Sequence, residues 1–166
     1  MGGAARLSVP LRLWPHPYEI ARLRGVPAGL PQLAVAGPPV ALVVGNGEVS
    51  LLAPTETVTA LAELVEVREP GWRAITLDAV LPLDTVGVLA RACAALAEIG
   101  VPVTVFASHG TDHLLVPAGQ LGRAVAALSQ AGFGETPLRR EDASPPPGSA
   151  AGAGHHPHVG RRLGKR

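Results

Sequence analysis

The chain has 166 residues, of which 47% are hydrophobic and 16% charged, and its formal net charge is +1. This length suits one ordinary domain or two very small ones. No basic stripe indicates a nucleic-acid partner, and apolar runs such as 35–44 are too short to cross a bilayer. The N-terminus lacks the apolar segment of a signal peptide. Composition therefore predicts a soluble, cytoplasmic protein that binds neither nucleic acid nor membrane.

The N-terminal half shows short strand patterns separated by turn residues. The segment Gly45-Asn46-Gly47 predicts a hairpin, because Asn and Gly tolerate positive φ. The elements expected around it are strands at 7–13, 18–23, 40–44, 48–52 and 65–67, a helical turn at 27–33 and a helix at 55–64. From residue 18 onward the expected order is β-α-β-β-α-β.

The C-terminal half has clearer periodicity. Residues 72–81 alternate between apolar and polar and are expected to form a strand. Asp84 is the expected N-cap of the helix that follows, and Gly100 its stop. Strands at 101–106 and 113–116 flank a turn at 108–111, and a second helix is expected from about residue 118 to Gly132. This half therefore reads β-α-β-β-α, without a last strand.

The two halves share one topology, offset by one strand. We therefore expect an α+β fold of two βαββαβ modules at 6–67 and 68–134, each an antiparallel sheet with helices on one face. The extra strand at 7–13 is expected to cross over and complete the second sheet. Residues 135–166 lack hydrophobic periodicity and contain a Ser-Pro-Pro-Pro-Gly-Ser segment, so a disordered tail is predicted there.

Three segments of the C-terminal half carry a resemblance to a known family. They are Gly-Val-Leu-Ala at 87–90, Leu-Ala-Glu-Ile-Gly-Val-Pro-Val at 96–103 and Ala-Ser-His-Gly-Thr-Asp-His-Leu-Leu-Val at 107–116. Together they resemble the tandem ACT-domain proteins related to the CASTOR-type amino-acid sensors, over roughly residues 6–133. The resemblance implies tandem ferredoxin-like ACT modules, no catalysis, and an amino-acid ligand at a module interface.

The candidate ligand-binding residues lie in two segments. In the hairpin, the carboxylate of Asp112 is suited to a ligand ammonium, and Ser108 and His109 offer a hydroxyl and an imidazole. At the helix start, the backbone N–H groups near Val86, Gly87 and Val88 favour a carboxylate. Each has a structural alternative: Asp112 capping its own turn, His109 in an exposed turn, and Gly87 serving only close packing. An N-capping Asp84 would also compete with an anionic ligand.

No catalytic or cofactor site is predicted. Cys93, the only cysteine, falls on the apolar stripe of a helix, so it is expected to be inert, and it excludes an intrachain disulfide. Ser8 and Ser50 lack a nucleophile-elbow motif, and Gly45-Asn46-Gly47 lacks the residues of a phosphate loop. The tail histidines at 155, 156 and 158 could hold a metal only loosely, and no metal role is expected.

The sequence thus predicts a non-enzymatic regulatory protein that binds an amino acid or similar small metabolite without a cofactor, with a homodimer as a candidate assembly. Two alternatives stay open. One is a ligand-free interaction or assembly module, since ACT-like sheets often pair edge to edge. The other is a ferredoxin-like enzyme, which would need a converging set of acid, base or nucleophile that the sequence does not reveal.

Overall fold

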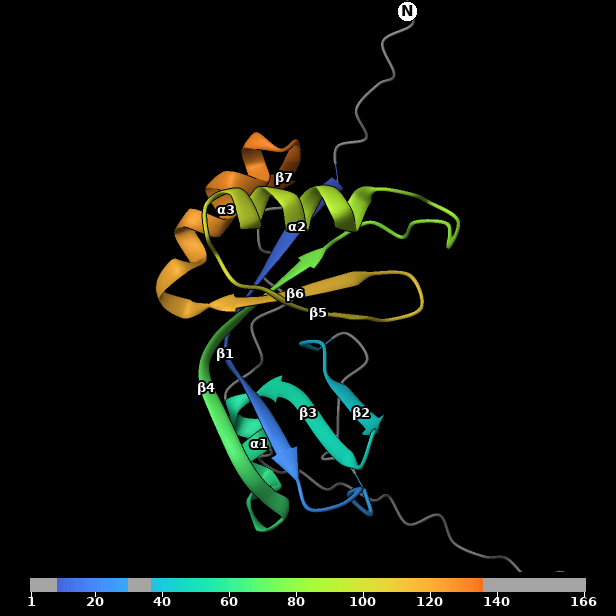
Figure 1. Ribbon diagram of the computed structural model, residues 1–166, viewed down its shortest axis with the longest axis vertical. Coiled ribbons are helices and arrows are strands. Elements are labelled where there is room, and N and C mark those ends of the chain that lie inside the picture. The colour runs from blue at the N-terminus through green and yellow to red at the C-terminus, as the bar shows by residue number, and fades with distance from the viewer. Residues whose placement is uncertain (1–8, 30–36, 136–166) are drawn as a thin grey trace, which may run out of the picture.

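The computed structural model describes residues 9–29 and 37–135. Its strands form one seven-stranded sheet. Six of them follow the order β2-β3-β1-β4-β6-β5, and the seventh, β7, also pairs with β1. Two long strands, β1 (Val9–Leu23) and β4 (Val65–Leu77), run antiparallel through both halves of the molecule. Figure 1 shows them linking the part that carries α1 to the part that carries α2 and α3.

The continuity of β1 and β4 corrects the expectation of two separate sheets. Over the described residues, the predicted strands at 7–13 and 18–23 belong to the single strand β1. Those at 65–67 and 72–81 are continuous in β4, which ends at Leu77. Between the parts of β1 lie Pro15 and Pro17, where the register with β4 shifts between Leu13 and Pro17. Proline has no N–H for the ladder, so a bulge here keeps the strand continuous while bending it. The sequence pattern is interrupted at this bulge, which is why two separate strands were predicted.

The N-terminal half has the strand order of a ferredoxin-like module. It contains β2 (Ala41–Gly45), β3 (Glu48–Pro54), α1 (Thr55–Ala60) and a 3-10 turn (Ala62–Leu64), with β2-β3-β1-β4 as neighbours. The predicted hairpin is confirmed, with positive φ at Asn46 and Gly47. The helical turn expected at 27–33 is absent from 27–29, and residues 30–36 lie outside the described residues.

An ion pair between a buried carboxylate and an exposed guanidinium joins the two long strands in this half. Glu19 on β1 is 3% exposed, and Arg68 on β4 donates to both of its carboxylate oxygens, at 2.7 and 2.9 Å. A buried carboxylate is stable only when paired in this way, and bidentate geometry is the strongest form of the pair. The Arg68 guanidinium also donates to the Thr59 hydroxyl of α1 at 3.2 Å, so the pair fixes the register of β1 on β4 beside that helix.

The C-terminal half is a complete βαββαβ module, which corrects the expected absence of its last strand. After β4 come α2 (Val88–Glu98), β5 (Thr104–Ala107), β6 (Asp112–Pro117), a 3-10 turn (Ala118–Gln120), α3 (Leu121–Gln130) and β7 (Phe133–Glu135). With only three residues, β7 is too short to show periodicity. Because Glu135 closes β7, the predicted tail begins inside the sheet; residues 136–166 lie outside the described residues.

The first strand pairs in the C-terminal sheet, as the predicted crossover requires, but it does not take the place of a last strand, because β7 supplies that strand. The first part of β1 pairs with β4 in the C-terminal half, with Leu11 opposite Leu77 and Leu13 opposite Ile75. On its other side β1 pairs in parallel with β7, where Val9 lies opposite Phe133. The N-terminal strand is therefore inserted between the first and last strands of the C-terminal module.

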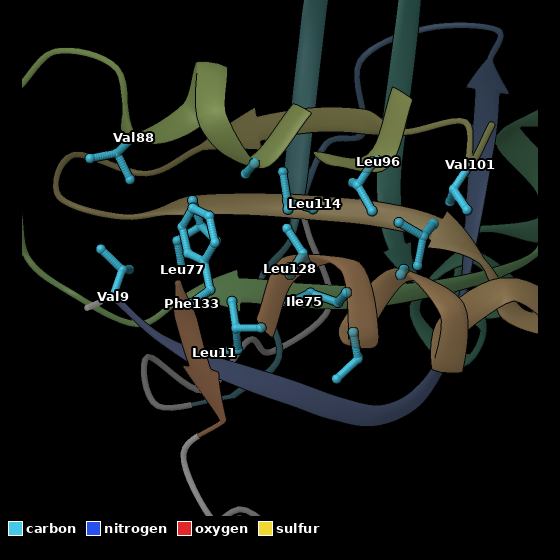
Figure 2. Packing of buried hydrophobic residues seen from close by; sticks show 14 residues of the cluster. Val9, Leu11, Ile75, Leu77, Val88, Leu96, Val101, Leu114, Leu128 and Phe133 are labelled. Atoms are coloured by element: carbon cyan, nitrogen blue, oxygen red, sulfur yellow. The ribbon is translucent and has the colours of Figure 1, made fainter. Parts of the chain in front are cut away.

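The main core lies between this part of the sheet and helices α2 and α3 (Figure 2). Its fully buried side chains come from strands and helices alike and include Leu11, Ile75, Leu96, Leu114 and Leu128. The apolar stripe predicted for the helix that contains Cys93 is confirmed in part. This helix is α2, in which Leu96 is buried and Leu89 packs against the same cluster. The predicted helix stop is also confirmed, because Gly100 has φ +66° directly after α2.

Candidate functional site

A cavity of about 230 Å³ opens between the β4–α2 loop, residues 78–87, and the β5–β6 turn, residues 108–111. Figure 1 shows the two segments extending side by side beyond the sheet. Of the six predicted site residues, five line this cavity: Gly87, Val88, Ser108, His109 and Asp112. Val86 is not among its lining residues and is 90% exposed. The fold thus brings together two segments that lie about twenty residues apart in sequence.

The β4–α2 loop supplies lining residues that the sequence did not indicate. The strand expected to reach residue 81 ends at Leu77, because the Ala79 N–H turns back to the Leu77 carbonyl at 2.8 Å. The loop then reaches the hairpin, where the Leu81 N–H donates to the Gly110 carbonyl at 3.4 Å. A Cβ on Gly110 would lie 3.2 Å from the Val80 side chain, so glycine permits this approach. The apolar alternation that continues past Leu77 concealed the end of the strand.

The start of α2 differs from the prediction in its cap. Gly87, with φ 84°, is the N-cap, and no side chain caps the helix. Asp84, the expected cap, lies in the preceding loop and is exposed. The N–H groups of the first helical turn therefore have no capping side chain, and the positive end of the helix dipole faces the cavity at Gly87 and Val88. The competition expected from Asp84 does not arise.

Asp112 is the first residue of β6, half-buried and opposite both Leu77 and Ala107. Within residues 9–29 and 37–135 its carboxylate makes no hydrogen bond or ion pair. The turn is closed instead by Ser108, whose N–H donates to the Thr111 carbonyl at 2.9 Å and whose hydroxyl lies 2.6 Å from that of Thr111. The alternative in which Asp112 caps its own turn is therefore not supported.

His113 points to the face of the sheet opposite Asp112, as expected for adjacent strand residues. It is buried, with 7% of its surface exposed. Its Nδ1 lies 2.9 Å from the Thr76 hydroxyl, which accepts the Trp14 Nε1–H at 2.8 Å, and its Nε2 lies 3.5 Å from the Thr111 hydroxyl. This chain of polar contacts ties the cavity hairpin to the crossing strand β1.

Burial lowers the pKa of His113, against the smaller opposing effect of the Asp112 carboxylate. The unfolded chain therefore binds the proton more readily, and the fold loses stability as pH falls below the ordinary histidine value of about 6.5. We predict a lower free energy of unfolding at pH 5 than at pH 7.5, measured by urea denaturation. A single group contributes a slope of at most about 1.4 kcal/mol per pH unit.

Two histidine variants test this assignment. His113→Gln should flatten the pH dependence, whereas His109→Gln, at an exposed turn position, should retain it. An unchanged slope in His113→Gln would show that other groups carry the effect.

The remaining sequence-level hypotheses concern reactivity, metals and membranes. Burial, with a smaller contribution from Asp112, raises the pKa of the Cys93 thiol, which agrees with an inert cysteine. The described residues contain no cluster of three metal-ligating side chains, and the tail histidines lie outside them. No helix in the described part of the chain is long and apolar enough to cross a membrane.

The residues that line the cavity fall within a segment that matches a known family model. Residues 67–130 match the family model of the ACT domain. This ACT segment begins in β4 and ends in α3, so it contains every residue that lines the cavity. No curated protein matches the chain.

Solved structures extend the likeness beyond the ACT segment. A protein from Agrobacterium tumefaciens has a TM-score of 0.65 at 23% identity, over 78% of this chain and 92% of its own. A Vibrio cholerae protein of unknown function, described as a possible transport protein, has 0.55 at 23%, over 75% and 91%. The ligand-free regulatory subunit of aspartate kinase from Thermus thermophilus has 0.52 at 18%, over 75% and 99%. At these identities the likeness establishes the fold, including the half that precedes the ACT segment.

Proposed function

We propose that this chain is a non-enzymatic regulatory protein that binds an amino acid in the cavity between the β4–α2 loop and the β5–β6 hairpin. One observation carries the proposal. The uncommitted carboxylate of Asp112 and the uncapped first turn of α2 face the same small cavity. A free amino acid carries an ammonium and a carboxylate on one carbon, and these two features are complementary to that pair of charges.

The family likeness supports a regulatory role. ACT domains are regulatory, ligand-binding modules, and the solved relatives include regulatory subunits of aspartate kinase. The sequence resemblance to CASTOR-type sensors agrees with this role. Binding would act by favouring one arrangement of loops, modules or subunits over another.

The cavity also contains Ser108, His109 and Asp112, three residue types of a hydrolytic triad, but not its geometry. The Ser108 hydroxyl bonds to Thr111, and the described residues contain no hydrogen bond from His109 to either Ser108 or Asp112. A nucleophile needs a base within hydrogen-bond reach. The proposal therefore contains no catalytic step.

A second candidate function is an assembly module that needs no ligand. Three of the most exposed large apolar side chains, Val80, Leu83 and Val86, lie on the β4–α2 loop. Exposed apolar residues gathered on one loop are typical of a contact surface, and a homodimer formed there would cover the cavity mouth. Light scattering of the purified chain with and without amino acids separates assembly that needs a ligand from assembly that does not.

A thermal-shift screen against the twenty standard amino acids tests the proposed function. A ligand at a hundred times its Kd stabilises the fold by about 2.7 kcal/mol, or a rise in Tm of about 5–10 °C. We expect such a rise with at least one amino acid. No rise with any amino acid at millimolar concentration would contradict the proposal and favour the assembly module.

A further inference from the structure

We infer that the cavity selects amino acids with a small, uncharged aliphatic side chain, of the class of valine, leucine and isoleucine. This inference rests on the proposed function above, because it assigns the part of the cavity that the ammonium and carboxylate of the ligand leave free. Three features of the cavity support this selectivity: the apolar side chains that line it, the charges of the lining residues and the volume of the cavity.

The inner wall of the cavity, meaning the lining residues that pack in the main core, is formed by apolar side chains. Leu77 and Val88 line it and belong to the main core, at 1% and 9% exposure. Ala79, Leu81 and Leu89 also line it and pack against the same core. A ligand side chain directed inward therefore meets apolar surface, and each buried methylene contributes favourably.

The hydroxyl groups of the lining come from the hairpin turn and the β4–α2 loop. Ser108 and Thr111 are in the hairpin turn and bond to each other at 2.6 Å, and Thr85 is in the exposed loop. The inner wall thus offers no free partner to a polar ligand side chain. Burying a hydroxyl or amide without a hydrogen bond is unfavourable, so this wall discriminates against polar side chains.

The charges of the lining residues exclude charged side chains. Asp112 is the only carboxylate among them, and no lysine or arginine lines the cavity. An acidic side chain would find no cation and would be repelled by Asp112. A basic side chain would need a second carboxylate once Asp112 holds the α-ammonium. The described lining therefore favours neutral ligands.

The volume favours a small ligand. The cavity has a volume of about 230 Å³. It lies below the range of about 300–1,000 Å³ that larger ligands occupy. Valine, isoleucine and leucine are small ligands of this kind.

Isothermal titration calorimetry of the full chain tests the inference with valine, isoleucine, leucine, threonine, aspartate and lysine. Threonine is the decisive member, because it has the shape of valine with a hydroxyl in place of one methyl. Apolar sites distinguish such a pair by up to about a hundredfold. We expect at least one aliphatic member to bind about tenfold to a hundredfold more tightly than threonine, and aspartate and lysine to bind more weakly still.

The outcomes separate this inference from the proposed function. Tighter binding of threonine, aspartate or lysine than of all three aliphatic members would overturn the inference and leave the proposed function intact. Failure of all six, together with a negative screen of the other amino acids, would overturn both.

A pair of leucine variants tests the inner wall itself. Leu89→Ala removes a lining side chain of α2, whereas Leu121→Ala removes a side chain of α3 that packs on the same core away from the cavity. With circular dichroism confirming that both fold, Leu89→Ala should weaken valine binding about tenfold and Leu121→Ala should leave it within about twofold. Equal effects of the two variants would contradict the assignment of the wall.

Discussion

Replacing Phe133 by Ala is expected to lower the free energy of unfolding by about 3–5 kcal/mol, the range for a buried aromatic residue. Phe133 is 2% exposed and lies on β7, opposite Val9 of the crossing strand. It packs in the main core, and the Arg91 guanidinium lies 4.7 Å from its ring centroid. The loss would be a large part of the 5–15 kcal/mol typical of a domain, because the variant removes the anchor of a three-residue strand.

The chain provides a matched control in its other phenylalanine. Phe106 lies on the edge strand β5 and is only half-buried. The centroid of its ring lies 4.9 Å from that of the His113 ring. Phe106→Ala should therefore cost less than Phe133→Ala in urea unfolding followed by circular dichroism. A loss for Phe133→Ala no larger than that of Phe106→Ala would show that β7 does not belong to the core.

The second large effect concerns the proposed site. Asp112→Asn should weaken amino-acid binding about tenfold to a hundredfold, because a hydrogen bond to a charged group contributes roughly 1.5–3 kcal/mol and each decade of affinity is about 1.4 kcal/mol. Stability should change little, since the described residues give its carboxylate no partner to lose. Calorimetry with the amino acid that gives the largest thermal shift measures the difference.

Asp84→Asn is the control for this variant. Asp84 is exposed on the loop that leads to α2, but it does not line the cavity. Each variant removes one negative charge from a segment that borders the cavity. Only the loss of a direct contact with the ligand should therefore make their affinities differ. Wild-type affinity in Asp112→Asn would reject the site, and unfolding of that variant would show that Asp112 is a structural turn residue.

Sequence patterns predicted the features that have a local signal, such as a turn residue, and those that follow from the shared topology of the two halves. The hairpin at Asn46 and Gly47, the helix that ends before Gly100 and the crossing of the first strand into the C-terminal sheet are of this kind. The patterns failed where pairing continues through irregular backbone. Separate strands were predicted at 7–13 and 18–23, although β1 continues through Pro15 and Pro17, and β7 is too short for any period.

The candidate site was predictable to a similar degree. Hairpin and helix-start residues were identified, and the fold brings Asp112 and Gly87 to one cavity. The loop between β4 and α2 was missed, because the apolar alternation continues to Leu81 although the strand ends at Leu77. Only the tertiary contact of Leu81 with Gly110 shows that this loop folds over the hairpin. Such a contact between distant segments has no local signal in the sequence.

The most direct test of the central claim is an NMR titration of the isotope-labelled chain with the amino acid that stabilises it most. If the cavity is the binding site, the largest amide shifts should fall on the first turn of α2, at 87–90, and on the hairpin at 108–112. The polar groove at the other hairpin, lined by Arg22, Asn46 and Glu66, serves as an internal control and should shift little. Largest shifts at that groove, or no shifts with any amino acid, would contradict the account.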